Sequence, residues 1–429
     1  MRRRTHKCVT VFLGLCCAAF ATHATAAVLK MTCRAKGQEL TLCKQAVQQW
    51  EKKTGHTVEI VSLPQSSSES FALTQQQLSA HASDVDVYQV DTTWVSFLST
   101  HAVPLDAHFS AQELAAHFPV ILQNNTVNGT LIVAPWYADV DMLFYRKDLL
   151  EKYGESPPTS WEDLLRIAQK IQENERASGH VRLWGYIFRG KAYEGLTCHV
   201  VEWIESFGGT LWPLDTDRVI QAFAFCARLI PTTSPMGVLS YTEEEVRGVF
   251  QLGDAVFAHN WPYMWTLTQS EESPVKGKVG ITVLPQGQLH GKPASVLGGW
   301  GLCVSRYSNH QEAAIDLVRW LTRSEEQHRR ALQASYCPTI HALYQDPVLC
   351  AAHPFFVHVA RALETVVLRP AGAFGRSYSQ VSASIANVTQ KVLLKAITPE
   401  AAAQKLDQDM KTLHKRVTET PATQRATGQ

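Results

Sequence analysis

The sequence has few charged residues, and the two signs nearly cancel. Its 429 residues include 40 Lys and Arg and 39 Asp and Glu, a charged fraction of 18% and a formal net charge of +1. The first 26 residues hold four basic and no acidic side chains, so without them the net charge of +1 becomes −3. Nucleic-acid-binding domains gather basic residues on one face. The sequence therefore does not indicate a nucleic-acid partner.

The sequence also lacks the spacings that bind metals and nucleotides. It has no CxxC pair and no HExxH motif, and its 17 histidines are scattered. No GxGxxG motif follows a strand and opens a helix. His353 and His358 lie close together in the sequence, but a surface position explains them better than a metal site does. We therefore expect no metal and no cofactor.

Long hydrophobic runs are absent except near the N-terminus. There, basic residues within 2–7 precede an apolar run over 8–20, and Ala24-Thr25-Ala26 offers a small-residue cleavage site. This order is typical of a secretory signal peptide, and the run is shorter than the about 18 residues that a membrane span needs. The residues before Cys16 fit a lipoprotein signal poorly. We expect residues 1–26 to be removed and the product to be soluble in the periplasm.

Cysteines are few and widely spaced. Seven remain after residue 26: Cys33, Cys43, Cys198, Cys226, Cys303, Cys337 and Cys350. Because seven is odd, at least one is unpaired or bonded to another chain. Export permits disulfides, but the sequence does not give their connectivity. Cys33 and Cys43 would close the shortest loop, and buried reduced thiols are an equally good interpretation.

The first part of the exported chain alternates between strand and helix patterns. Strands are predicted over 28–32, 57–63 and 85–90, and helices over 39–53 and 71–80. Such alternation predicts an α/β fold with a parallel sheet and helices on both faces. Ligands of these sheets bind beyond the carboxyl ends of the strands, which is where Asp91 would lie.

The stretch 134–154 concentrates groups suited to recognising a polyol. Trp136, Tyr137, Asp139 and Asp141 lie within six positions, before an apolar run and a short helix that ends near Gly154. An aromatic face packs on the apolar face of a sugar, and a carboxylate accepts hydrogen bonds from its hydroxyls. The alternative is that the aromatic residues are core and the aspartates cap the next turn.

Later segments combine aromatic residues with glycine or proline. A helix capped by Ser160 is predicted to follow Pro157-Pro158, and the segment 184–209 is interrupted by glycines. Residues 249–265 predict a strand followed by a bent loop that carries Trp261, because Pro262 disfavours helical angles there. Residues 297–305 predict a glycine-rich turn that leads into a strand.

Four stretches, over 134–154, 185–209, 248–265 and 297–324, with a weaker fifth at 273–279, resemble the periplasmic sugar-binding proteins of ATP-binding cassette (ABC) importers. The motifs Tyr-Glu-Gly-Leu-x-Cys, Asn-Trp-Pro-Tyr and Leu-Gly-Gly-Trp are similar to those of the trehalose/maltose-binding subgroup of extracellular solute-binding protein family 1. The resemblance implies a two-lobed type II fold that closes on a sugar about its hinge. It also implies delivery of that sugar to a membrane permease served by a cytoplasmic ATPase, no catalysis, and a monomer.

The resemblance also implies a set of ligand contacts and a division into lobes. Asp91 and Asp139 would accept hydrogen bonds from hydroxyls, Arg369 would donate, and Trp261 and Trp300 would stack on the sugar. The full implied set is Glu39, Asp91, Tyr137, Asp139, Trp261, Tyr263, Gly298, Gly299, Trp300 and Arg369. The expected ranges are 27–138 with 290–340 for the N-terminal lobe, 139–289 with 341–415 for the C-terminal lobe, and 416–429 for a flexible tail.

Two departures from the family pattern leave the identity of the sugar open. Some members carry an Arg where this chain has Ser66–Glu69, and Asp141 occupies a position that is usually small. The same fold could therefore bind another sugar or a non-sugar solute. A glycoside hydrolase, with Asp91, Asp139 and Asp141 as acid and base, is the remote alternative. We expect Asp139 and Asp141 to point in different directions, which disfavours it.

Overall fold

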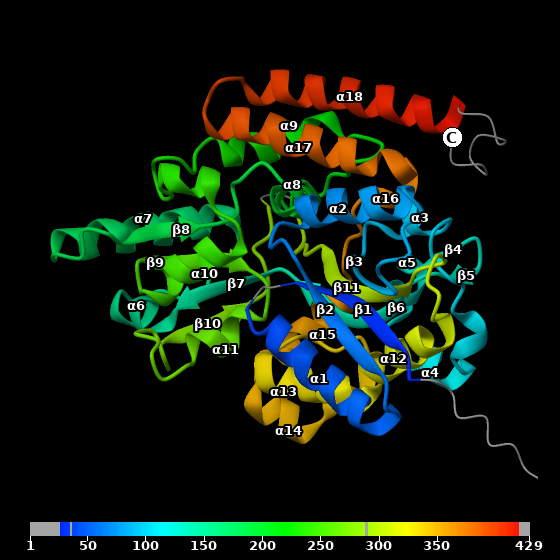
Figure 1. Ribbon diagram of the computed structural model, residues 1–429. Helices are drawn as coiled ribbons and strands as arrows, with labels where there is room; N and C mark the ends of the chain where they lie inside the picture. Colours follow the sequence, from blue (N-terminus) through cyan, green and yellow to red (C-terminus); the bar gives the residue numbers. More distant parts are fainter. Residues whose placement is uncertain (1–25, 35–36, 288–290, 420–429) are drawn as a thin grey trace, which may run out of the picture.

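The computed structural model describes residues 26–34, 37–287 and 291–419. The predicted signal peptide, except for Ala26, lies outside the described residues. Within those residues, none of the helices combines the length and apolar character needed to span a bilayer. The chain forms an α/β structure with two principal sheets, each in its own lobe, as the sequence predicts (Figure 1).

The first lobe contains a five-stranded sheet with the order β2-β1-β3-β11-β6. Its strands are β1 (Val28–Arg34), β2 (Thr57–Leu63), β3 (Val87–Asp91), β6 (Ala134–Val140) and β11 (Leu297–Val304). Strand β1 pairs in parallel with β2 and β3, which confirms the predicted parallel arrangement of these three. Strand β11 is antiparallel to both β3 and β6, so the whole sheet is mixed.

Helices from three parts of the chain accompany this sheet. They are α1 (Glu39–Thr54), α2 (Ser67–Ser79), α3 (Val95–Leu98), η1 (Asp106–His108), α4 (Ala111–Ala115), α5 (Pro119–Asn124), α12 (Gln311–Thr322), α13 (Ser324–Ala334), η3 (His341–Gln345), α14 (Pro347–Ala352) and α15 (Phe356–Glu364). A short hairpin, β4 (Thr126–Val127) and β5 (Thr130–Leu131), lies between α5 and β6. Helix α14 contacts α13, and α15 contacts β6. Residues 347–364 thus pack with the first lobe, whereas the sequence assigned them to the second.

The second lobe contains a four-stranded sheet with the order β10-β7-β9-β8. Its strands are β7 (Met142–Arg146), β8 (Trp184–Ile187), β9 (Ala255–Asn260) and β10 (Val279–Thr282). The accompanying helices are α6 (Lys147–Lys152), α7 (Trp161–Ala177), α8 (Glu194–Ser206), α9 (Thr216–Cys226), η2 (Met236–Ser240), α10 (Glu243–Gln251), α11 (Met264–Thr268), α16 (Ala371–Phe374), η4 (Gly375–Ser377), α17 (Tyr378–Leu393) and α18 (Pro399–Glu419). Figure 1 shows α17 and α18 side by side along one edge of this lobe.

The chain passes between the lobes three times. It leaves the first sheet at the end of β6 and enters the second at Met142, so Asp141 lies at the crossing. It returns between β10 and β11. It crosses again after α15, where Val367 forms a bridge with Val296 before α16 begins. These passages place the junction of the lobes beside the ends of β3, β6 and β11.

Local sequence patterns predict several of these elements well. Helix α1 buries Leu42, Ala46, Val47 and Trp50, and it ends at Gly55 in a left-handed conformation with φ of 77°. This geometry suits glycine because it has no Cβ. The Ser160 side chain accepts a hydrogen bond from the backbone N–H of Asp163 and caps α7, as predicted.

Three boundaries differ from the predictions. Helix α2 begins at Ser67, before the predicted helix over 71–80, because the Ser66 side chain caps it. Residues 297–304 form the predicted strand from Leu297 onward, without the predicted glycine-rich turn before it, because β3 and β6 supply hydrogen-bonding partners on both sides. Helix α18 continues through Glu419, so the first residues of the predicted tail, 416–419, are helical. The rest of that tail lies outside the described residues.

All seven described cysteines are free thiols, and six of them are buried. Burial raises the pKa of the Cys33 thiol well above its usual range, and contact with Cys43 adds to this effect. The neutral thiol is the less reactive form. Of the two interpretations of Cys33 and Cys43, the structure shows the reduced pair.

Candidate functional site

A small cavity lies between the lobes at the ends of β3, β6 and β11. It is lined by Arg34, Ser67, Asp91, Asp139, Glu194, Gly195, Cys198, Glu243, Trp261, Gly298, Gly299, Trp300 and Arg369. The space that admits the centre of a water-sized sphere is about 20 Å³, and on that measure one water needs about 10–15 Å³. The lobes are thus closed over these side chains, and a larger ligand requires them to separate.

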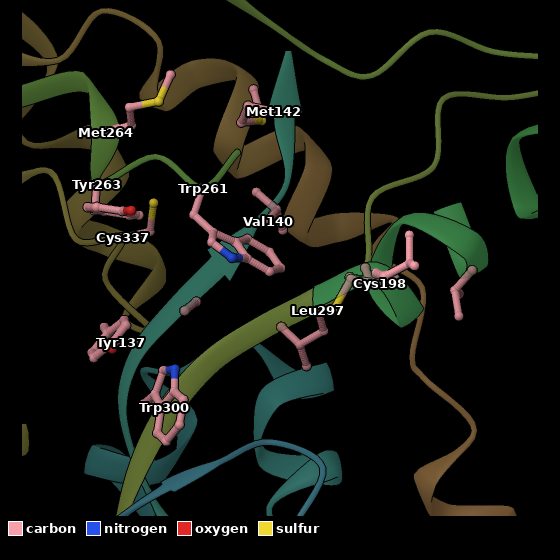
Figure 2. Packing of buried hydrophobic residues seen from close by; sticks show 14 of the residues in the cluster. Tyr137, Val140, Met142, Cys198, Trp261, Tyr263, Met264, Leu297, Trp300 and Cys337 are labelled. Atoms are coloured by element: carbon pink, nitrogen blue, oxygen red, sulfur yellow. The ribbon is translucent and has the colours of Figure 1, made fainter. Parts of the chain in front are cut away.

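The lining includes two tryptophans supplied by different lobes. Trp300 lies on β11 of the first lobe, paired with Asp91 on one side and Tyr137 on the other. Trp261 follows β9 of the second lobe (Figure 2). Each indole also meets a buried guanidinium. The central guanidinium carbon of Arg34 is 4.1 Å from the Trp300 ring centroid, and that of Arg189 is 4.5 Å from the Trp261 centroid. Cation–π contacts of this kind hold aromatic rings in place.

Two glycines in β11 allow the close packing beside Trp261. A Cβ on Gly298 would lie 2.8 Å from the Trp261 ring. Gly299 has φ of +107°, and a Cβ there would lie 2.4 Å from the carbonyl oxygen of Tyr137. Residues with side chains are strained at this φ. The glycines are therefore required by geometry, whatever contact their backbone makes with a ligand.

Arg369 connects the two lobes across the cavity. Its guanidinium lies 3.2 Å from the Asp91 carboxylate in the first lobe and 2.7 Å from the Glu194 carboxylate in the second. It also donates to the Thr92 hydroxyl at 2.7 Å. Burial alone would lower the pKa of Arg369, but the nearby carboxylates outweigh it and raise the pKa well above its usual range. Arg369 therefore stays charged and bridges the closed lobes.

The charges around the cavity are mixed. Its lining includes four carboxyl groups, of Asp91, Asp139, Glu194 and Glu243, and two guanidinium groups, of Arg34 and Arg369. Burial raises the pKa of Glu194, partly offset by Arg369. An anionic ligand would meet the carboxylates, and a cationic ligand would meet the guanidiniums. The set is suited to a neutral ligand with many hydroxyl groups, which can donate to carboxylates and accept from guanidiniums.

Seven of the ten residues predicted from the sequence line this cavity: Asp91, Asp139, Trp261, Gly298, Gly299, Trp300 and Arg369. Glu39, Tyr137 and Tyr263 do not. Glu39 accepts hydrogen bonds from Tyr137 and Gln89, each at 2.5 Å, in the interior of the first lobe. Tyr263 donates to Glu244 at 2.7 Å. These three side chains therefore lie outside the lining of the closed cavity.

Six lining residues were not predicted: Arg34, Ser67, Glu194, Gly195, Cys198 and Glu243. A signal was present for five of them. Arg34 ends a strand beside Asp91, and Glu194, Gly195 and Cys198 belong to the recognised Tyr-Glu-Gly-Leu-x-Cys motif at the start of α8. Ser67 lies in the Ser66–Glu69 segment, where some family members carry an Arg. Glu243 has no comparable signal, because only the folding of α10 brings it to the cavity.

Asp139 and Asp141 do point in different directions. Residues two apart on a regular strand share a face, but β6 ends at Val140 and β7 begins at Met142. Asp139 lines the cavity, whereas Asp141 is fully buried in the second lobe against the Arg189 guanidinium. The pair therefore does not act on one ligand bond.

Among the described residues, one group of histidines and carboxylates comes close enough to suggest a metal site. Asp141, His199, Glu202 and His259 are fully buried, and one potential ligand atom of each lies within 4.8 Å of the others. Glu202 lies 3.3 Å from the His199 Nδ1 and 3.0 Å from the His259 Nε2. Burial lowers the pKa of both imidazoles well below their usual range, so both are neutral.

Hydrogen bonds in this group argue against a bound metal. The backbone N–H and the Nε–H of Arg189 both donate to His199 Nε2, each at 3.2 Å. The Arg189 Nη2 also lies 3.2 Å from His199 Nδ1, so this guanidinium contacts both ring nitrogens. It also supplies a positive charge beside Asp141, which a metal ion there would have to meet. We interpret the group as an ionic network that supports Arg189 under Trp261.

Comparison with known proteins identifies relatives along most of the chain. The family model of the bacterial extracellular solute-binding proteins matches residues 38–328. A protein of Deinococcus radiodurans named "Probable ABC transporter-binding protein" is 45% identical over 404 residues, which cover 92% of this chain and 96% of that protein.

Solved structures also match this chain over most of its length. Maltose-bound MalE3 of T. maritima is 35% identical, with a TM-score of 0.85 over 90% of this chain and 100% of that chain. The GacH receptor of Streptomyces glaucescens is 20% identical, with a TM-score of 0.79 over 91% of this chain and 99% of that chain. The second likeness shows the shared fold alone.

Proposed function

The chain belongs to the bacterial extracellular solute-binding proteins, and from this membership we propose that it captures an α-glucoside disaccharide of the trehalose or maltose type. It is the substrate-binding component of a sugar ABC transporter and is not an enzyme, as its family and relatives are transporter-binding proteins. The proposal covers the identity of the sugar, the residues that contact it and the periplasmic location. The lining of the cavity between the lobes supports the first two parts.

The observation that supports it most is the pair of tryptophans from opposite lobes. Trp261 and Trp300 line one cavity together with Asp91, Asp139 and Arg369. A glucosyl ring has an apolar face that stacks on an indole and a rim of hydroxyls that pair with carboxylates and guanidiniums. Two indoles suit two linked rings. We propose that each indole packs on one ring and that Asp91 and Asp139 accept hydrogen bonds from the hydroxyls.

The relatives favour this class of sugar but do not identify the individual sugar. MalE3 of T. maritima, at 35% identity, was solved with maltose. Two structures at 21% identity were solved with ribitol and with D-mannitol. At such low identity these two indicate the fold, and their ligands serve here as controls. An α-glucoside disaccharide is therefore the first ligand to test.

A thermal-shift panel tests the proposal. A ligand that binds only the folded state raises the midpoint of unfolding. We expect maltose or trehalose to raise it more than glucose, ribitol, mannitol or tagatose at equal concentration. A larger shift with a polyol than with any disaccharide would overturn the choice of sugar class. A shift with none of the compounds would overturn the proposed ligand altogether.

An assay for free glucose tests the absence of catalysis. A carrier must release its sugar intact to the permease, so maltose and trehalose should remain unchanged after long incubation with the protein. Sustained glucose release by the wild type, lost on replacing Asp139→Asn, would identify a hydrolase instead.

A further inference from the structure

In the closed form, the indole of Trp300 is already covered by other side chains of the protein. The guanidinium carbon of Arg34 lies 4.1 Å from the centroid of this ring, and both residues line the cavity. Trp94 packs edge-to-face on the same indole at a centroid distance of 5.4 Å. Trp300 as a whole is 5% exposed. A sugar that stacks on this indole must therefore first take the place of a protein group.

The position of Arg34 in the first sheet explains how it reaches the ring. Arg34 is the last residue of β1, and Trp300 lies on β11. Strand β3 separates these two strands in the sheet, so their backbones are about 10 Å apart. Two long side chains meet across this distance. Because both strands belong to the first lobe, opening of the lobes does not by itself separate the two residues.

The hydrogen bonds of Arg34 leave part of its guanidinium unpaired. Its Nη2 donates to the backbone carbonyl of Gln65, and its backbone N–H donates to Gln89 Oε1 at 2.8 Å. Its Nε is buried and has no hydrogen-bond partner among the residues that the structure describes. A buried donor without a partner is destabilising. The guanidinium is thus incompletely paired while it covers Trp300, which favours its displacement by a ligand.

Nearby carboxylates can receive the guanidinium when it leaves the ring. Burial alone would lower the pKa of Arg34. The carboxylates of Glu39, Glu243 and Asp91, among other groups, outweigh this effect and raise the pKa above its usual range. Asp91 ends β3, the strand between Arg34 and Trp300. A guanidinium that moves off the indole therefore stays charged and has an acidic partner on the same lobe.

We propose that Arg34 is a built-in competitor of the ligand: it covers the indole of Trp300 while no sugar is bound, and a sugar ring must displace it to stack there. The inference rests on the proposed function, in which Trp300 packs on one ring. Arg34 then lowers the affinity for sugar and increases selectivity. A ligand takes its place only with a flat apolar face that packs on the indole at least as well as the guanidinium does. An acyclic polyol has no such rigid face.

A double-mutant cycle on Arg34 and Trp300 tests the proposal. Calorimetric titration with maltose or trehalose, whichever the wild type binds more tightly, measures the affinities of the wild type, Arg34→Ala, Trp300→Ala and the double variant. We expect Arg34→Ala to bind the sugar about fivefold more tightly than the wild type, which corresponds to a competing cation–π contact of about 1 kcal/mol. In the Trp300→Ala background the same substitution should leave the affinity unchanged, because the ring for which Arg34 competes is gone.

Two further variants make the test specific. Lys30→Ala removes a positive charge from the same strand outside the cavity lining, so it should leave the sugar affinity unchanged. Arg34→Gln is neutral but keeps an amide donor for the Gln65 carbonyl. It tests the same competition should Arg34→Ala fail to fold, and a gain in affinity is expected there too.

The outcomes separate the competition from the proposed function. Weaker or unchanged sugar binding on replacing Arg34 would overturn the competition while leaving the proposed function intact. The same gain in the Trp300→Ala background would also overturn it, because Arg34 would then act without Trp300. Failure of the wild type to bind either disaccharide would overturn the proposed function, and the competition with it.

Discussion

Trp261 is held from two sides by groups that are themselves fixed. The Arg189 guanidinium lies over its ring, and Glu243 accepts a hydrogen bond from its indole nitrogen at 3.4 Å. Arg189 in turn contacts Asp141, the aspartate that the family pattern does not explain. Asp141 therefore does not line the cavity: its charge keeps Arg189 in place beneath the indole ring of Trp261, which does.

Replacing Trp261→Ala should weaken maltose binding by about 1–3 kcal/mol, roughly ten- to a hundredfold, because a large apolar contact is lost. Titration calorimetry measures the affinity, and chemical denaturation measures the change in folding stability. Trp265→Ala is the matched control, since Trp265 packs on Phe355 and does not line the cavity. Equal losses of affinity in both variants would count against a direct contact by Trp261.

Most of the aromatic and acidic residues that the sequence pointed to line the cavity, but Glu39 does not. The carboxylate of Glu39 is buried and lies 3.9 Å from the Arg330 guanidinium, which stacks over Trp136 at 4.1 Å. This network joins residues almost 300 positions apart, so local pattern gives no indication of it. The sequence does not distinguish a buried acidic residue from one that binds a ligand. The two are distinguished only by their surroundings in the folded protein.

Folding stability should fall in mild acid because His117 is buried in its neutral form. Burial lowers the pKa of His117 from its ordinary 6.5 to about 4. Between these values the unfolded chain binds a proton that the folded chain does not, so the free energy of unfolding decreases as pH falls. The loss reaches on the order of 3 kcal/mol near pH 4.

Denaturation of the wild type and His117→Gln between pH 7 and pH 4 measures this contribution. Glutamine can still bond to the Thr339 hydroxyl, which lies 2.8 Å from the histidine in the wild type, but it does not titrate. The pH dependence should therefore be smaller in the variant, while replacing the exposed His310→Gln should leave it unchanged. Parallel pH profiles for all three proteins would contradict the account.

At the scale of single elements, β11 determines the shape of the site. It pairs with β3 and β6, and it carries Gly298, Gly299 and Trp300 into the cavity. The sequence predicted a glycine-rich turn that leads into a strand, because glycines weaken a strand. What makes it a strand is the pairing with two partners far away in sequence. By contrast, α1 and α7 were predicted closely, because their caps and apolar stripes are local.

Gly299→Ala should lower the free energy of unfolding by at least about 2 kcal/mol, because it combines an unfavourable φ with a backbone overlap. Gly248→Ala is the matched control: Gly248 lies within helix α10, and a Cβ there has no neighbour within 4 Å. That substitution should raise stability by up to about 1 kcal/mol. Urea denaturation measures both, and a stable Gly299→Ala protein would show that β11 tolerates a side chain at this position.

At the scale of the whole molecule, the site exists only where the two lobes meet. Asp91, Asp139 and Trp300 belong to the first lobe, and Glu194, Glu243 and Trp261 belong to the second. Arg369, on the third crossing segment, bonds to both lobes. The resemblance implied this arrangement and the structure has the same two-lobed fold. The packing of residues 347–364 on the first lobe was not predicted, because the sequence of a short helix does not indicate which sheet the helix packs against.

The space left in the closed cavity has room for about one water, so a disaccharide can enter only an open form. Sugar held by groups from both lobes then favours the closed form over the open one. This closure on a sugar is the central claim, because it joins the fold, the site and the role in transport.

Small-angle X-ray scattering of the exported protein, with and without saturating maltose, tests this claim most directly. Saturation is established beforehand by calorimetry, and Trp261→Ala at the same sugar concentration provides the control for weakened binding. The account predicts a smaller radius of gyration with maltose than without it, and a smaller change in the variant. An unchanged radius of gyration in sugar-saturated wild type would contradict closure of the lobes on the sugar.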